Sequence, residues 1–224
     1  MGFLNILEWA RSHPVEHFIY ASSSSVYGNS EHVPFSATAN ADRPISLYAA
    51  TKRANELMAE SYSHLFGIPA TGLRFFTVYG PYGRPDMAPM KFAKQIMLGG
   101  QIDVYNHGQL SRDFTFIDDI VEGILRLLHK PPETNQTASR HRVFNIGRGE
   151  PVNLLKFIEI LEQAFDKPVK KRYLPMQDGD VSTTWADVSE LRAVTGYSPQ
   201  VGIEEGVRTF AHWYKKYYAD GQST

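Results

Sequence analysis

The chain has 224 residues, of which 42% are hydrophobic, and a formal net charge of -1. This length allows one large domain or a domain with a smaller lobe, and the balanced charge argues against a nucleic-acid partner. The chain has no cysteine, which excludes disulfides and thiol nucleophiles, and no apolar run approaches the roughly 20 residues of a membrane span. We therefore expect a cytoplasmic protein with no membrane partner and no metal.

Helical and strand signals alternate along the first half of the chain. The predicted elements are, in order, a helix at 2–12, a buried strand at 17–22, a helix at 47–66, a buried strand at 70–76 and a helix at 87–98. Ser46 is a suitable N-cap for the second helix and Gly67 a suitable stop. Between them, residues 28–45 carry glycine, asparagine and proline, which predicts a long loop.

The second half continues the alternation. Its predicted elements are a short strand at 113–117, a helix at 118–129, a strand at 142–146, a helix capped by Asn153, a strand at 169–174, and helices near 188–195 and 203–218. The polar stretch 131–141 predicts a mobile surface loop. Strands that alternate with helices indicate an α/β fold with a largely parallel sheet.

One set of residues has the chemistry of a proton-transfer site. A serine run, Ser22 to Ser25, follows the strand at 17–22, and Tyr48 and Lys52 lie one turn apart on the helix at 47–66. An ammonium beside a phenol favours the phenolate and lowers the pKa of the tyrosine, which makes a general base for an alcohol. A serine hydroxyl that faces this tyrosine could bind the same alcohol. By itself, however, the spacing is also compatible with a surface pair and a turn.

Longer motifs carry a more specific signal. They are ASSSSVYG at 21–28, SLYAATK at 46–52, LRFFTVYGPYGRPDMA at 73–88, RDFTFIDDIVEGI at 112–124, FNIG at 144–147 and GDVSTTWAD at 179–187. They resemble the extended short-chain dehydrogenase/reductase family of NAD-dependent epimerases and dehydratases, and within it most of all the UDP-glucuronate 4-epimerases. The resemblance covers nearly the whole chain.

The family implies a doubly wound parallel-sheet (Rossmann-like) fold with a smaller C-terminal substrate-binding lobe. In this chain the remaining Rossmann-like part would be 1–80, and 81–224 would mainly form the lobe, with 113–147 returning to the first part. The family's glycine-rich turn for the NAD pyrophosphate lies upstream of all these motifs. The resemblance therefore implies an N-terminally truncated fold that lacks about a hundred residues and four strands. The strand at 17–22 should then be an unpaired edge with bare apolar surface, and NAD binding should be weak.

The nearest glycine-rich candidate within the chain is Gly147-x-Gly149. It comes late in the sequence, and Val152 stands where a third glycine would be needed. We interpret it as a loop unrelated to a dinucleotide.

The family's site residues can be transferred position by position. The resemblance implies that Tyr48 takes the proton of the sugar 4-hydroxyl, that Lys52 holds the nicotinamide ribose and tunes Tyr48, and that Ser23 is the catalytic hydroxyl. It further implies sugar contacts for Ser24 and Ser25, nicotinamide contacts for Phe75 and Val78, carboxylate contacts for Thr77 and Arg84, a diphosphate contact for Arg112 and a nucleoside contact for Asp180.

The implied reaction is NAD-dependent epimerisation of UDP-glucuronate to UDP-galacturonate through a 4-keto sugar. That intermediate is a β-keto acid and can lose carbon dioxide, so the enzyme has to restrain the carboxylate. We expect Arg84, with its two-pronged guanidinium, and Thr77 to do so.

Several alternatives stay open. A dehydratase would need an acidic pair at Ser24 and Ser25, and UDP-glucose 4-epimerases usually carry asparagine at Thr77 and arginine at Gln177. A UDP-glucuronate decarboxylase uses the same keto intermediate. The chain could also be a non-catalytic remnant that binds UDP-sugar or pairs with related subunits, or a fragment without a function of its own. The family further implies a homodimer through the helix at 47–66, whose apolar face carries Leu47, Ala50, Ala54, Leu57 and Met58.

Overall fold

A three-stranded parallel sheet forms the centre of the N-terminal part. The computed structural model describes residues 1–30, 32–134, 138–177 and 181–220. The strands lie in the order β1 (Phe18–Ser23), β2 (Ala70–Phe75) and β6 (His141–Ile146). Their last residues are in register, so that Ser23 pairs with Phe75 and Phe75 with Ile146. The carboxyl ends of the strands therefore meet at one edge of the sheet.

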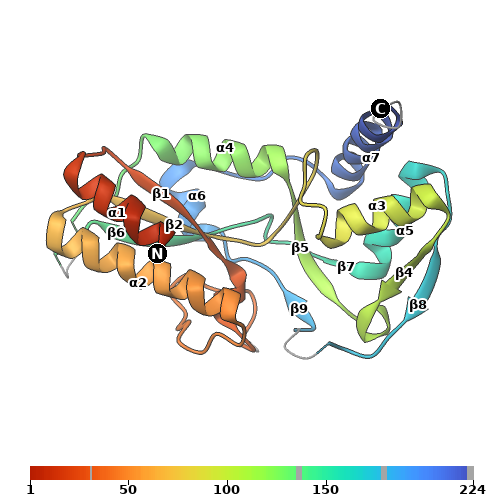
Figure 1. The fold of residues 1–224 in the computed structure, drawn as a ribbon, viewed down its shortest axis with the longest axis horizontal. Helices are drawn as coiled ribbons and strands as arrows, with labels where there is room; N and C mark the ends of the chain where they lie inside the picture. The colour runs from red at the N-terminus through yellow and green to blue at the C-terminus, as the bar shows by residue number, and fades with distance from the viewer. Residues whose placement is uncertain (31, 135–137, 178–180, 221–224) are drawn as a thin grey trace.

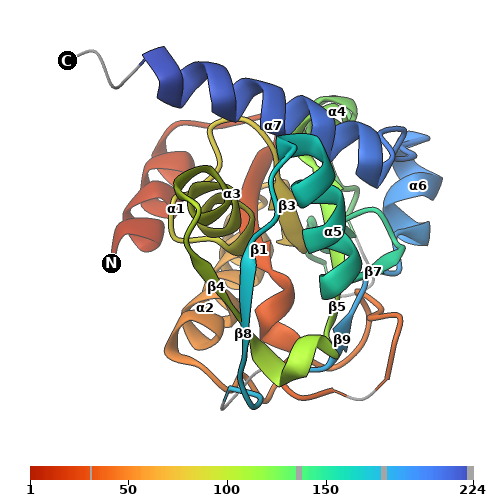
Figure 2. The same cartoon turned by 90° about the vertical axis from the view of Figure 1, so that its right-hand side faces the viewer.

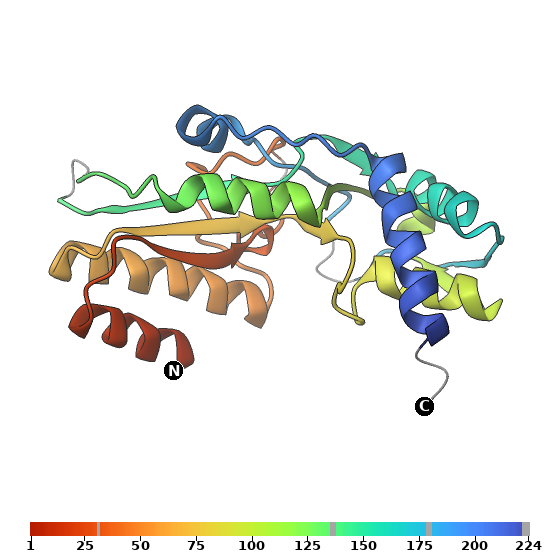
Figure 3. The same ribbon diagram turned by 90° about the horizontal axis from the view of Figure 1, so that it is seen from above.

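Helices cover both faces of this sheet (Figures 1 and 3). One face carries α1 (Gly2–Ser12) and α2 (Leu47–Phe66), and the other carries α4 (Ile117–Leu128) and α6 (Ser189–Thr195). The prediction of an α/β fold with parallel strands is confirmed. Among the described residues β1 pairs with β2 alone, so β1 is the edge strand that the sequence predicted.

The ends of α2 follow from local sequence. The Ser46 hydroxyl accepts a hydrogen bond of 3.1 Å from the Ala49 amide, and Gly67 adopts the left-handed conformation with φ 69°. Both capping predictions are confirmed. The inner face of the helix buries Ala49, Glu56, Ala59 and Ser63, whereas Leu47 and Leu57 on the predicted apolar face are 83% and 53% exposed.

The remaining elements form a second part with its own core (Figure 2). They are β3 (Thr77–Tyr79), α3 (Ala88–Leu98), β4 (Gln101–Val104), β5 (Ser111–Phe116), β7 (Pro151–Asn153), α5 (Leu154–Phe165), β8 (Lys170–Tyr173), β9 (Thr183–Thr184) and α7 (Ile203–Asp220). β5 lies between β3 and β7 and also pairs with β9, and β4 pairs with β8. The rings of Phe114 and Phe157 stack at 4.0 Å in this core.

The structure differs from the predicted elements at short segments. The strand expected at 70–76 is divided at Phe76 into β2 and β3, and β4, β7, β9 and the two 3-10 turns at Ser24–Tyr27 and Tyr105–Gly108 were not predicted. These strands have two to four residues, too few to show an alternation of apolar and polar positions. Within the described residues, no helix has the length and apolar character needed to cross a membrane. The proposed division of the chain at residue 80 stays a prediction.

Candidate functional site

The serine run lies where β1 ends and the chain turns. Ser23 is the last residue of β1 and is 8% exposed. Its hydroxyl accepts a hydrogen bond of 3.2 Å from the Ser25 amide and donates one of 3.1 Å to the Ser25 hydroxyl. Ser23 thereby caps the 3-10 turn that follows, which fixes its side chain at the carboxyl edge of the sheet.

Tyr48 and Lys52 lie together on the first turns of α2. The Lys52 ammonium is 5.8 Å from the centre of the Tyr48 ring and donates a hydrogen bond of 3.0 Å to the carbonyl oxygen of Ala21 in β1. The structure therefore brings the amine to the phenol and to the serine strand at once. Tyr48 is 50% exposed, so its hydroxyl is accessible to a ligand.

The second strand contributes the next predicted residues. Phe75 and Val78 are half-buried and pack against the core between the sheet and α4. Thr77, between them in sequence, points to the other side and lines two hollows of the surface. The break in the strand at Phe76 therefore separates side chains that pack inward from one that faces a cavity.

Two adjoining cavities share Thr77 and Arg112. The smaller, about 230 Å³, contains four predicted substrate residues, and its lining is Ser24, Ser25, Gly28, Phe35, Ile45, Ser46, Thr77, Arg112, Val181 and Thr184. The larger, about 730 Å³, continues between α3 and β5, where its lining includes Lys91, Lys94, Gln95, Tyr105, Leu110 and Gln177. Two connected spaces suit a ligand with two moieties.

Arg112 is held by backbone at the junction of these cavities. Its guanidinium donates hydrogen bonds of 3.0 Å to the Ser111 carbonyl and 3.2 Å to the Ser182 carbonyl. The second bond reaches the chain just before β9, so pairing of β9 with β5 helps to orient Arg112. Asp180, the predicted nucleoside contact, lies outside the described residues.

Arg84 lies apart from the other predicted substrate residues. Its guanidinium forms a two-pronged ion pair with Asp86, with N–O distances of 3.1 and 2.5 Å, and its side chain is 68% exposed. Neither cavity described above includes Arg84 in its lining. Asp86 raises the pKa of Arg84, and a smaller contribution comes from Tyr48, so Arg84 is within electrostatic range of that residue.

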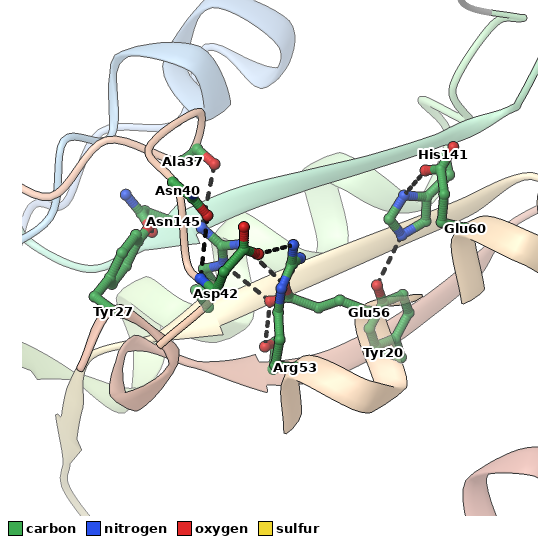
Figure 4. A network of polar contacts seen from close by, with 12 residues as sticks. Tyr20, Tyr27, Ala37, Asn40, Asp42, Arg53, Glu56, Glu60, His141 and Asn145 are labelled. Atoms are coloured by element: carbon green, nitrogen blue, oxygen red, sulfur yellow. Dashed lines mark hydrogen bonds and ion pairs between the residues drawn. The ribbon is translucent and has the colours of Figure 1, made fainter. Parts of the chain in front are cut away.

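A buried charge network behind the site was not predicted. Glu56 on α2 and Arg74 on β2 form a two-pronged ion pair, with distances of 2.9 and 2.8 Å (Figure 4). Arg53 bonds the same carboxylate at 2.9 Å. The only sequence signal was a charged residue inside an otherwise buried strand, because Arg74 interrupts the apolar run 70–76.

The Gly147 loop proves to be an internal anion site. The amides of Arg148 and Gly149 donate hydrogen bonds of 2.8 and 2.9 Å to the carboxylate of Asp113. A Cβ at Gly147 would lie 2.9 Å from the same carboxylate, which explains the need for glycine. The loop therefore binds a carboxylate of this chain, and its interpretation as unrelated to a dinucleotide is supported by the geometry.

Comparison with known proteins agrees with these observations. Residues 1–147 match the model of the NAD dependent epimerase/dehydratase family. An uncharacterized protein of Methanocaldococcus jannaschii is 54% identical over 96% of this chain and 64% of its own length. A probable UDP-glucuronate 4-epimerase of Rhizobium meliloti is 48% identical over 100% of this chain and 69% of its own length.

A solved structure shows the same fold with ligands. The UDP-glucuronic acid 4-epimerase of Bacillus cereus, in complex with UDP-glucuronic acid and NAD, superposes with a TM-score of 0.83 at 34% identity. The match covers 96% of this chain and 67% of that protein. The chain thus spans about two thirds of the length of the proteins it matches, and less than two thirds of the first of them.

Proposed function

Because this chain belongs to the NAD-dependent epimerase/dehydratase family, we propose that it is the catalytic and sugar-binding part of a UDP-glucuronate 4-epimerase. The observation that carries the proposal is the contact of Lys52 with both Tyr48 and the serine strand, at the edge of a cavity with Thr77 and Arg112. The relatives named for UDP-glucuronate 4-epimerisation support the choice of sugar.

Each residue of this group has a distinct role in proton transfer. The Tyr48 phenolate takes the proton of the sugar 4-hydroxyl, and the Lys52 ammonium favours that phenolate through its charge. The Ser23 hydroxyl binds the same sugar oxygen and keeps it in line with Tyr48. The bond from Lys52 to the Ala21 carbonyl limits where the ammonium can move, which holds the three groups in one arrangement.

The two cavities divide the substrate between them. The cavity of about 230 Å³ takes the glucuronate, with Ser24 and Ser25 as hydrogen-bonding groups, and the cavity of about 730 Å³ takes the UDP. Arg112 lines both cavities, which is the place for a charged group that binds the diphosphate between the moieties. Asp180 would meet the nucleoside end.

The residues present fit the nicotinamide end of NAD. Tyr48, Lys52, Phe75 and Val78 come from α2 and from the carboxyl end of the sheet, which is where doubly wound folds bind dinucleotides. NAD, when bound, would accept the hydride of sugar carbon 4 and return it to the opposite face. The chain itself would hold the sugar and move the hydroxyl proton.

A UDP-glucuronate decarboxylase is the second candidate, and the position of Arg84 favours keeping it. Thr77 lines the sugar cavity, but the Arg84 guanidinium is bound by Asp86. A sugar carboxylate would have to displace Asp86 to be gripped by Arg84. If it does not, the 4-keto acid is less restrained and decarboxylation competes with epimerisation.

The test is an assay of the chain extended by the nucleotide-binding segment of the Rhizobium relative, with UDP-glucuronate and NAD. UDP-galacturonate as the main product supports the epimerase, and Tyr48→Phe in the same protein should abolish it. A UDP-pentose as the main product supports the decarboxylase. If Arg84 restrains the carboxylate, Arg84→Ala should raise the pentose fraction. No turnover with either outcome would favour a binding module. The chain of 224 residues alone should turn over little.

We also propose a homodimer through α2. The exposed apolar side chains of this helix are Leu47, Leu57, Leu65 and Phe66, with exposures of 83, 53, 66 and 46%. Contiguous exposed apolar surface of this kind is typical of an interface.

A further inference from the structure

The carboxylate of Glu56 is buried and fully hydrogen-bonded. Its side chain is 1% exposed. One oxygen accepts from the Ser22 hydroxyl at 2.6 Å and from Arg74 at 2.9 Å. The other accepts from Arg53 at 2.9 Å and from Arg74 at 2.8 Å. A carboxylate has about four acceptor sites, so every one is in use.

The bond to Ser22 belongs to a two-point contact between α2 and β1. Lys52 donates to the Ala21 carbonyl at 3.0 Å, and one helical turn later Glu56 accepts from Ser22. The two partners in β1 are consecutive residues, and Ser23 follows them directly. Shifting the helix along the strand would break both bonds. Glu56 therefore sets the register that puts Lys52 and Tyr48 opposite Ser23.

The other partners of Glu56 attach a loop to the same helix (Figure 4). Arg74 donates to the Ala37 carbonyl at 3.1 Å, and Arg53 donates to Asp42 at 3.1 Å. Residues on either side of this stretch, Phe35 and Ile45, line the cavity assigned to the sugar. The carboxylate thus links the loop that closes this cavity to the helix that carries the base.

We propose that Glu56 is a positioning residue for the reaction: it fixes α2 against the serine strand and holds the loop at 36–45 over the sugar. This inference rests on the proposed function for the roles of Tyr48, Lys52 and Ser23. A buried ion pair of this kind contributes little net stability, because desolvation offsets the attraction. Its value here is geometric, since four directed hydrogen bonds define one arrangement of β1, β2, α2 and the loop.

The experiment compares hydrogen exchange and ligand affinity in the 224-residue chain, its Glu56→Gln variant and a Glu60→Gln control. Glu60 lies one turn further along α2 and pairs with His141. In Glu56→Gln an amide group faces guanidinium donors, so we expect exchange at 36–45 and at the first turn of α2 to rise about tenfold. Exchange in α5 should stay unchanged. Glu60→Gln should leave the loop as in the unchanged chain.

Ligand affinity separates positioning from general stability. Glu56→Gln should weaken binding of UDP-glucuronate about tenfold and leave binding of UDP within about twofold, because the loop lines the sugar cavity alone. Equal weakening of both ligands, or unchanged exchange at 36–45, would overturn the proposal. If the unchanged chain binds UDP but not UDP-glucuronate, the proposed function fails, and the exchange data still decide the role of Glu56.

A milder variant covers the case in which Glu56→Gln does not fold. Ser22→Ala removes one hydrogen bond and leaves the ion pair with Arg74 intact. We expect faster exchange in the first turn of α2 and weaker UDP-glucuronate binding, each by severalfold. Exchange and affinity equal to those of the unchanged chain would show that the contact between Ser22 and Glu56 positions nothing.

Discussion

The carboxylate of Asp113 accepts a hydrogen bond of 2.9 Å from the backbone amide of Gly149. Amides of a glycine-containing loop that point at one spot form an anion site, which is the geometry that phosphate-binding loops use. Here a side chain of β5 occupies that spot. Asp113 also accepts from the Ala186 amide at 3.1 Å and the Thr115 hydroxyl at 2.9 Å, so it joins β5 to the segments on both sides of the substrate cavities.

Asp113→Asn should therefore destabilise the protein. Asp113 is fully buried, and burial raises the pKa of its carboxyl while the amide hydrogen bonds oppose that shift. An asparagine amide group cannot accept from backbone N–H groups, so we expect the free energy of unfolding to fall by about 2–3 kcal/mol. Urea denaturation measures this. The control is Asp118→Asn on the exposed side of α4, and an equal effect of the two changes would contradict the role of Asp113.

The same relationship bears on NAD. Because the Gly147 loop is filled from within and the sequence has no other glycine-rich turn of the required spacing, we expect the 224-residue chain to bind NAD weakly. Isothermal titration should give no saturable binding in the micromolar range. UDP is the positive control, since the residues of the larger cavity are all in the chain. Micromolar binding of NAD would show that the pyrophosphate grip is not required.

The long elements and the order of the site were predictable because each has a periodic or capping signal. The apolar stripe of α5 and its Asn153 cap, whose side chain accepts from the amides of Leu155 and Lys156, are examples. The pairing of Tyr48 with Lys52 was also predictable, because four residues make about one helical turn. Arg84 shows the limit, since residue type and position in a loop do not reveal that Asp86 already binds it.

The buried network could not be predicted because its members are far apart in sequence. Ser22 and Glu56 are separated by 34 residues, and Tyr27 and Asn145, whose side chains bond at 2.6 Å, by 118. Each residue taken alone is an ordinary polar position. Only the fold shows that these groups converge under the loop at 28–45.

The exposed apolar face of α2 predicts self-association. Leu57 is 53% exposed on this face, so Leu57→Glu would place a charge in the proposed interface. We expect the unchanged chain to sediment as a dimer and the variant as a monomer in analytical ultracentrifugation. Leu98→Glu is the matched control, because Leu98 is 64% exposed but lies at the end of α3. Equal sedimentation of all three proteins would place any interface elsewhere.

His141 makes stability depend on pH. Its side chain is 6% exposed and lies between Glu60, at 2.5 Å, and the Tyr20 hydroxyl, at 2.8 Å. Burial outweighs the charge of Glu60 and lowers the pKa of His141 below its ordinary value of 6.5. Below pH 6.5 the unfolded chain therefore binds more protons than the folded one, and stability falls as the pH falls toward the folded pKa. Urea denaturation between pH 8 and pH 5 should show this loss, and His141→Gln should reduce it. His17, whose pKa burial also lowers, accounts for part of the remainder. Parallel pH curves for the variant and the unchanged chain would mean that His141 binds protons equally in both states.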